Sequence, residues 1–342
     1  MKYYNDEDIS DTLKAIDEHV RDELKSRPEQ KRDWRTYEQM DAERIRDAIK
    51  SLDPLIHEAV SAIHVDDAGP GRPSALTLEQ KVKLLLIKQL VGKSNREFAY
   101  MLEIFSMISG IDISYKTVER LYSDELVMMA LHNLHVLLLK KKGIKKSDAT
   151  GDGTGYSLTV KKNYESYAQE LKDKAKENRN DDDKGKQSAK KRKTFAYSFR
   201  LMDLRTKMYI AFGSSMKSEK EAFDNAINFI KTVDVKLKSV RLDKYYSESS
   251  YVSLFDKDTA VYVIPKKDAT LNGSQKWKDT MREFVTDTYQ YLKEYYKREN
   301  SEAGFSADKK LFGWEIAQRR EDRIDSALFC TGLWHNLFNL NG

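Results

Sequence analysis

The stretch Phe195-Ala196-Tyr197-Ser198-Phe199-Arg200-Leu201 alternates large apolar residues with small or polar ones. A period of two is typical of a β-strand with one buried face. Apolar runs on either side of this stretch predict four more strands, at 153–160, 208–212, 240–243 and 260–264. An amphipathic helix is expected between the third and fourth strands, and a short helix before the fifth. This order predicts an α/β fold with a mixed five-stranded sheet flanked by helices.

The strands belong to a domain that we expect to span residues 143–342. A helix at 295–312 and another that ends near Leu340 complete it. Residues 161–194, between the first two strands, are dense in charged side chains and longer than neighbouring strands need for a connection. We therefore predict that this charged segment is an excursion from the domain.

Residues 71–142 are expected to form a separate helical region. Three short helices are each opened by a capping residue, followed by a longer connecting helix from about Asp124 to Lys142. The capping signals are Thr77 with Gln80, Ser94 with Glu97, and Ser114. Such a series suits a helix-turn-helix DNA-binding region, and a generic three-helix bundle is the alternative.

Four residues of this region are candidates for DNA contact. Tyr115, Lys116 and Arg120 lie on the third helix, where a helix-turn-helix would face the bases and phosphates. Arg72, in Gly71-Arg72-Pro73, is placed to enter a narrow minor groove. A plain linker is the alternative for that tripeptide.

Residues 1–70 are predicted to be an acidic helical module, with helices at 6–26 and 36–65. Arg27-Pro28 and Asp53-Pro54 are expected to interrupt them. The module has a net charge of −7, whereas residues 71–342 have +12. A basic body with an acidic front end fits a polyanionic partner.

The composition excludes several classes of protein. With 342 residues, 40% hydrophobic and 34% charged, the chain can build a core of more than one domain. It has no apolar run of membrane-spanning length and no basic-then-apolar signal at Met1, so we expect a soluble, cytoplasmic, nucleoid-associated protein. The single Cys330 excludes an internal disulfide and is expected to be buried. His132 and His135 lie among leucines and are expected to be structural.

Three acidic residues are candidates for catalysis and for metal binding. Asp152 is expected to open the first strand, Asp243 to end the fourth, and Glu302 to lie on the helix at 295–312. If the first and fourth strands are neighbours and that helix crosses their ends, the three carboxylates converge. Carboxylates with phosphate oxygens can hold two Mg²⁺ ions, with Mn²⁺ as a substitute. Two such ions suit in-line displacement at a phosphodiester.

The neighbours of these acids support the same chemistry. Gly153 and Gly155 favour Asp152 over Asp148, because glycine lets the backbone approach a ligand closely. Glu302 shares one helix face with Tyr295, Arg298 and Lys309. The two cations would place phosphates and the tyrosine would stack or donate a hydrogen bond.

At these residues the chain resembles the DDE transposases of prokaryotic insertion sequences, in the group with a Tyr-Arg-Glu-Lys signature. The signature matches Tyr295, Arg298, Glu302 and Lys309, and further matches are Asp152-Gly153-Thr154-Gly155, Asp243-Lys244-Tyr245-Tyr246-Ser247, Pro265-Lys266-Lys267 and Trp277-Lys278. The resemblance covers roughly residues 71–342.

The resemblance implies an RNase H-like catalytic domain. It also implies a helix-turn-helix that holds the terminal inverted repeats, with Lys266 among the DNA contacts. The implied reaction is metal-dependent nicking of double-stranded DNA followed by attack of the 3′-hydroxyl on target DNA. A homodimer on DNA is expected, because two element ends must be brought together. The alternatives are an RNase H-like nuclease that does not join ends, and a DNA-binding regulator with an inactive catalytic domain.

Overall fold

The structure of the chain, a computed structural model, describes residues 6–26, 33–64, 76–109, 113–158, 195–267 and 269–340. Within these ranges the side chains of 6–9, 104–109 and 300–301 are not described. Arg72 and the charged segment 161–194 lie outside the described residues, so the predictions for them stay predictions.

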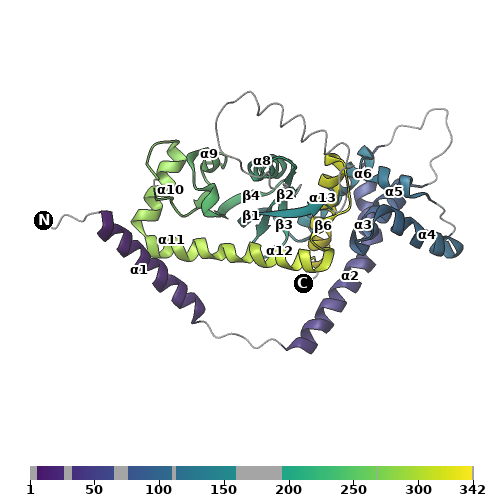
Figure 1. Cartoon of the computed structure of the whole chain (residues 1–342), viewed down its shortest axis with the longest axis horizontal. Helices are drawn as coiled ribbons and strands as arrows, with labels where there is room; N and C mark the ends of the chain where they lie inside the picture. The colour runs from purple at the N-terminus through teal and green to yellow at the C-terminus, as the bar shows by residue number, and fades with distance from the viewer. Residues whose placement is uncertain are drawn as a thin grey trace, which may run out of the picture.

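A mixed sheet of six strands forms the centre of the molecule (Figure 1). Its order is β3-β2-β1-β4-β5, with β6 paired to the end of β1. The first three strands are antiparallel, whereas β4, β5 and β6 extend the sheet in parallel. The strands are β1 Lys146–Leu158, β2 Phe195–Asp203, β3 Tyr209–Ser215, β4 Lys236–Leu242, β5 Ala260–Tyr262 and β6 Glu315–Ile316.

Helices cover both faces of the sheet. In Figure 1, α8 lies on one side of the strands, and α11 and α12 run along the other. The helices are α1 Asp6–Lys25, α2 Trp34–Ser61, α3 Leu78–Val91, α4 Asn95–Ser109, α5 Tyr115–Leu121, α6 Glu125–Lys141, α8 Glu219–Ile230, α9 Ser249–Val252, α10 Gln275–Thr286, α11 Thr288–Tyr295, α12 Glu299–Phe312 and α13 Glu321–Phe338, with 3₁₀ turns η2 Lys244–Tyr246 and η3 Tyr296–Arg298.

One large hydrophobic core joins the sheet to the helical region that precedes it. The carboxyl-terminal helix α13 contacts α2, α3, α6 and β3. Its Trp334 is fully buried, and the indole Nε1 donates a hydrogen bond to the Leu86 carbonyl of α3 at 2.8 Å. The last helix therefore fixes the helical region against the sheet.

A second, smaller core lies beside α11. It consists of Val20 of α1 together with Phe284, Tyr291 and Leu292. The first helix thus packs on α11, whereas α2 packs on α3 and α6.

The sequence signals for the helical region are confirmed. Thr77 and Gln80 form a complete capping box, and Gly92 ends α3 in the left-handed conformation at φ 68°. Ser94 and Glu97 exchange both capping hydrogen bonds, at 3.3 and 3.1 Å. Ser114 accepts from the Thr117 amide and opens α5. Each cap satisfies amides that the first helical turn leaves unpaired.

Several predicted boundaries are wrong. Within the described residues the sheet has six strands rather than the five predicted. The sequence analysis missed β6 because this strand has only two residues and shows no period. The first strand begins at Lys146, so Asp152 lies inside it instead of opening it. Pro54 does not end a helix, since α2 continues through it and buries Leu55, Ile56 and Ala59 beyond.

The helix predicted over 295–312 is also interrupted. Tyr295 ends α11, a 3₁₀ turn carries Arg298, and α12 begins at Glu299. A 3₁₀ helix has three residues per turn rather than 3.6, so one helical period does not describe the whole run.

No helix within the described ranges is long and apolar enough to cross a membrane.

Gly213 of β3 provides a test of the packing between sheet and α8. A Cβ there would lie 2.0 Å from the Ala222 carbonyl oxygen and 2.4 Å from the Ala226 amide nitrogen. We predict that Gly213→Ala lowers the free energy of unfolding by at least about 1–3 kcal/mol, because the helix must move away from the strand. The measurement is urea denaturation followed by circular dichroism.

Gly155→Ala is the matched control for this prediction. Gly155 also lies in a strand, but its Cβ would meet nothing closer than Phe195 at 3.5 Å. Equal stability of the two variants would contradict the close contact between Gly213 and α8.

Candidate active site

The parallel pairing of β1 and β4 brings Asp152 and Asp243 together. Gly151 and Leu242 are partners in this register, and each is followed directly by one of the two aspartates. Asp243 also caps the 3₁₀ turn η2, accepting from the Tyr245 amide at 2.9 Å. The predicted adjacency of the first and fourth strands is therefore confirmed.

Arg298 links both aspartates to Glu302. Its Nη1 lies 3.2 Å from Asp152 Oδ2 and 3.5 Å from Asp243 Oδ2, and its Nη2 lies 2.9 Å from Glu302 Oε1. The three carboxylates come from β1, from the end of β4 and from α12. One guanidinium thus marks the point at which three separate elements meet.

Two buried arginines of the sheet hold the helices on either side of Arg298. Arg241 of β4 forms an ion pair with Glu294 of α11 and donates from Nε to the Glu294 carbonyl at 3.0 Å. Arg200 of β2 pairs with Asp308 of α12 at 2.5 Å. Because α11 is fastened to β4 and α12 to β2, the turn between them has little freedom to carry Arg298 elsewhere.

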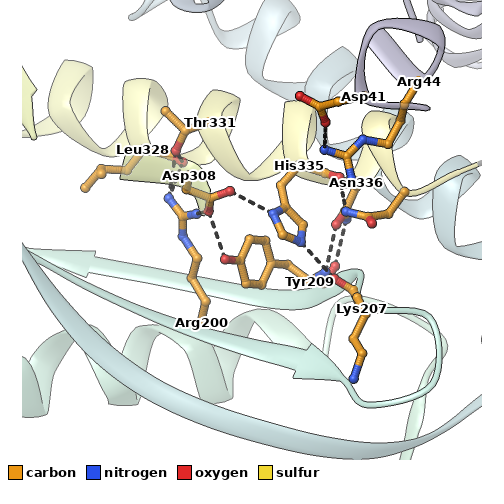
Figure 2. Close-up of polar contacts among 11 residues, drawn as sticks. Asp41, Arg44, Arg200, Lys207, Tyr209, Asp308, Leu328, Thr331, His335 and Asn336 are labelled. Carbon is orange, nitrogen blue, oxygen red and sulfur yellow. Dashed lines mark hydrogen bonds and ion pairs between the residues drawn. The ribbon is translucent and has the colours of Figure 1, made fainter. Parts of the chain in front are cut away.

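Asp308 is the centre of a buried polar network (Figure 2). Its Oδ2 accepts from Arg200 and, at 2.8 Å, from the Tyr209 hydroxyl, while its Oδ1 lies 2.7 Å from His335 Nδ1. The other ring nitrogen of His335 lies 2.8 Å from the Lys207 carbonyl. Burial opposes ionisation of Asp308, but His335 and Arg200 outweigh it and lower its pKa. The network ties α12 to β2, β3 and α13.

The carboxylate site itself is electrostatically crowded. Burial raises the pKa of Asp152 to about 6; the charge of Arg298 opposes this rise, and Asp243 and Glu302 add to it. The side chains of Asp243 and Glu302 are more exposed, at 39% and 57%. Three acids around one arginine leave an excess of negative charge, which a further cation would balance.

The donor set fits magnesium in chemical type, because Mg²⁺ prefers carboxylate oxygens and keeps several waters. As the side chains stand, no three or more His, Cys, Asp or Glu in the described part of the chain surround a common metal position. The cation that the three acids share here is Arg298. Metal binding would require the carboxylates to turn from the guanidinium.

A groove of about 1190 Å³ opens beside this cluster. Tyr295, Arg298 and Glu302 line it, and so does Lys266, whose ammonium pairs with Glu248 at 2.6 Å. Lys309 of α12 does not line the groove. Its Nζ donates to Thr154 Oγ1 of β1 at 2.5 Å. Burial and the charge of Arg200 lower the pKa of Lys309.

The predicted contact residues of α5 do not line this groove. Lys116 and Arg120 are exposed and one helical turn apart, while Val118 and Leu121 face the core. The Tyr115 ring is half-buried under the guanidinium of Arg96, 5.1 Å from its carbon to the ring centroid.

Alternative site residues have structural roles. Asp148 accepts from the Ser239 hydroxyl at 2.5 Å, four residues before Asp152. His135 is fully buried against Phe212 and Phe229, and burial lowers its pKa to about 3. Burial raises the pKa of the Cys330 thiol to about 12, as expected for an inert core residue.

A search of curated proteins finds a relative that matches almost the whole chain. The chain is 44% identical over 330 residues to the probable transposase for insertion sequence element ISA1214 of Archaeoglobus fulgidus. The match covers 96% of this chain and 95% of the relative. The chain belongs to the insertion-sequence transposases. No family model matches this transposase. No solved structure matches it either.

The sequence did not reveal how the transposase fixes its carboxylates. Asp308 stands next to Lys309 of the signature, but its partners Arg200, Tyr209 and His335 are distant in the sequence. The alternation at 195–201 places Arg200 among the polar positions of the strand and therefore offered no signal that Arg200 is buried. Lys244 and Lys267 also line the groove beside the cluster and were not singled out as contacts.

The buried network yields a stability prediction for the transposase. Asp308→Asn leaves the charge of Arg200 buried without a counter-ion, so we expect a loss of about 3–5 kcal/mol in the free energy of unfolding. Because the folded pKa of Asp308 is lowered, its stabilisation is present above the unfolded pKa of about 4 and is lost as pH falls through the folded value. Denaturant titrations at neutral and acidic pH measure both effects.

Asp279→Asn is the control, because the ion pair of Asp279 with Arg282 is exposed on α10. Its unfolding midpoint should stay close to that of the unchanged protein. A similar small change for Asp308→Asn would show that the network is not needed to hold α12.

Proposed function

We propose that this chain is a DDE-type transposase with an RNase H-like catalytic domain, which cuts DNA at the ends of an insertion sequence and joins them to target DNA. The main support is the convergence of Asp152, Asp243 and Glu302 on Arg298, from three elements of one sheet-and-helix unit. Membership of the insertion-sequence transposases supplies the substrate class.

In this proposal the three carboxylates hold two Mg²⁺ ions, with Mn²⁺ as a substitute. When bound, the ions supply activation of the attacking oxygen and stabilisation of the leaving oxygen. Arg298, Lys266 and Lys309 bind non-bridging phosphate oxygens, and Tyr295 forms the wall beside them.

The proposed chemistry consists of two displacements at phosphorus. In the first, water attacks a phosphodiester, and the bond to the 3′-oxygen breaks to leave a 3′-hydroxyl. In the second, that hydroxyl attacks a phosphodiester of the target, and one P–O bond forms as another breaks. Both steps need the same positioning of phosphate and acids, so one site can serve both.

The helices α3 to α5 are proposed to hold the terminal inverted repeats of double-stranded DNA. Lys116 and Arg120 lie on the exposed side of α5, and the short helix is pinned by Val118 and Leu121 beneath. Arg72 would add a minor-groove contact. We propose the organisation 1–70, 71–142 and 143–342 for this function, and a homodimer that brings two element ends together.

Replacing any one of the three acids should abolish chemistry. We predict that Asp152→Asn, Asp243→Asn and Glu302→Gln each reduce DNA cleavage and joining below detection, while DNA binding persists. The measurement is gel analysis of supercoiled plasmid that carries the inverted repeats flanking the gene, incubated with Mg²⁺. Asp148→Asn, on the same strand, should keep activity.

The products separate the alternatives. Joined products support a transposase, and cleavage without joining by the unchanged protein would indicate a nuclease. Binding without any cleavage would indicate a DNA-binding regulator. Near-normal cleavage by one of the three variants would remove that residue from the catalytic set.

The α5 contacts have a separate prediction. Lys116→Ala with Arg120→Ala should weaken binding to the inverted repeats and lower the slope of log affinity against log salt by about 1.8, or about 0.9 for each lost phosphate contact. Fluorescence anisotropy over a salt series measures the slope. Lys50→Ala, an exposed lysine of α2, is the control, and an unchanged slope in the double variant would exclude α5 from the phosphate contacts.

A further inference from the structure

The groove beside the carboxylate cluster has two walls. One belongs to the catalytic unit and carries Lys244, Lys266 and Lys267. The other is the first helix of the chain, α1, which lies along α11 (Figure 1). Arg298 and Glu302 line the same groove, so it leads directly to the point where the three acids meet.

The basic residues of α1 line this groove, and most of its described acidic residues do not. The helix contains three basic residues other than histidine, Lys14, Arg21 and Lys25, and all of them line the groove. Of the five acidic residues from Asp11 to Glu23, only Asp17 does so. A helix that is acidic as a whole therefore turns its cations to the groove.

Specific contacts hold α1 in this orientation. Tyr296 of η3 donates to Asp17 and accepts from Arg21 Nε at 2.9 Å. Glu23 accepts from the Tyr289 hydroxyl and pairs with Lys293 at 2.8 Å, both on α11. These contacts surround the small apolar core around Val20. The acids of α1 that do not face solvent thus bind η3 and α11, which leaves Lys14 and Lys25 directed to the groove.

We propose that α1 is one wall of the DNA channel of the active site, and that Lys14 and Lys25 bind phosphates of the strand that enters the carboxylate cluster. The inference rests on the proposed function, because it takes the groove's occupant to be the DNA substrate. A phosphodiester backbone suits the groove, since it carries a regular row of negative charges that cations on two facing walls can contact.

The available charges on α1 fit this role. Among the described side chains, Lys14 forms an exposed ion pair with Asp11 of its own helix, at 3.0 Å, and such pairs contribute little and exchange readily. Lys25 is exposed in the last turn of the helix. Arg21 is already engaged with Tyr296 and serves to dock the helix. The two lysines can therefore bind phosphate without undoing the packing of α1.

The test is binding of Lys14→Gln with Lys25→Gln to a duplex that has a 3′ single-stranded tail, in EDTA so that no cleavage occurs. We expect the slope of log affinity against log salt to fall by about 1.4–1.8, according to whether the contacted phosphates are single- or double-stranded. Lys146→Gln with Lys238→Gln is the matched control, since it removes the same charge from exposed positions at the other end of β1 and β4. The control slope should equal that of the unchanged protein.

A crosslinking experiment locates the contact on α1. Lys25→Cys should form a disulfide with DNA that carries an activated disulfide tether on its backbone, by thiol–disulfide exchange that releases the activating thiol, whereas Glu18→Cys, exposed on the same helix outside the groove, should not. The native thiol of Cys330 is fully buried and does not compete.

The outcomes distinguish this inference from the proposed function. An unchanged slope together with no crosslink at position 25 overturns the role of α1, even if the protein cleaves and joins DNA normally. An equal loss of slope in the control pair also overturns it, because any removed charge would then suffice. A reduced slope with crosslinking at position 25 alone supports it, whether or not replacing the three acids abolishes cleavage.

Discussion

The structure depends on keeping one carboxylate ionised in the interior. Asp308 is buried, and a buried charge is tolerated only when partners replace the water that it loses. Arg200, Tyr209 and His335 supply those partners from two strands and the last helix. Satisfying Asp308 thereby fixes the position of α12 on the sheet. Glu302, on the same helix, is therefore held close to Asp152 of β1 and to Asp243 at the end of β4.

The fold then gathers like charges where they repel each other. Parallel pairing of β1 and β4 places Asp152 beside Asp243, and α12 adds Glu302. Arg298 offsets part of this repulsion, but burial and the neighbouring acids still raise the pKa of Asp152. Arrangements of this kind cluster at functional sites, because a cluster of acids that costs stability must be maintained for another reason. In a member of the insertion-sequence transposases, DNA chemistry is the reason that we propose.

The groove beside the carboxylate cluster joins α1 to segments that lie more than two hundred residues later in the chain. Its inner end is formed by Arg298 and Glu302, and its outer wall by α1, which lies nearly the whole chain length away in sequence. The contacts of Tyr296 with Asp17 and Arg21 connect this wall to the turn that carries Arg298. The electrostatics of the groove therefore reflect the orientation of α1 more than its net charge. An acidic helix can contribute to a binding site for a polyanion when its acidic side chains contact the rest of the protein and its basic side chains face the site.

The sequence by itself determined the local elements and pointed to the three acids that the fold brings together on Arg298. Capping residues such as Thr77 and Ser114, and the period-two stretch at 195–201, depend on interactions within a few residues and are visible in one chain. The pairing of β1 with β4 could also be predicted, because the helix between β3 and β4 allows the chain to cross over and return beside the first strand. Only the tertiary structure decided the extent of β1, the two-residue β6, the break at η3 and the continuation of α2 through Pro54, since each depends on packing between segments distant in the chain. The same holds for the partners of Asp308 and the docking of α1. The contacts of Asp308 with Arg200 and Tyr209, and that of Tyr296 with Asp17, join residues more than ninety positions apart, and His335 lies 27 positions from Asp308. No local periodicity encodes which of these side chains meet.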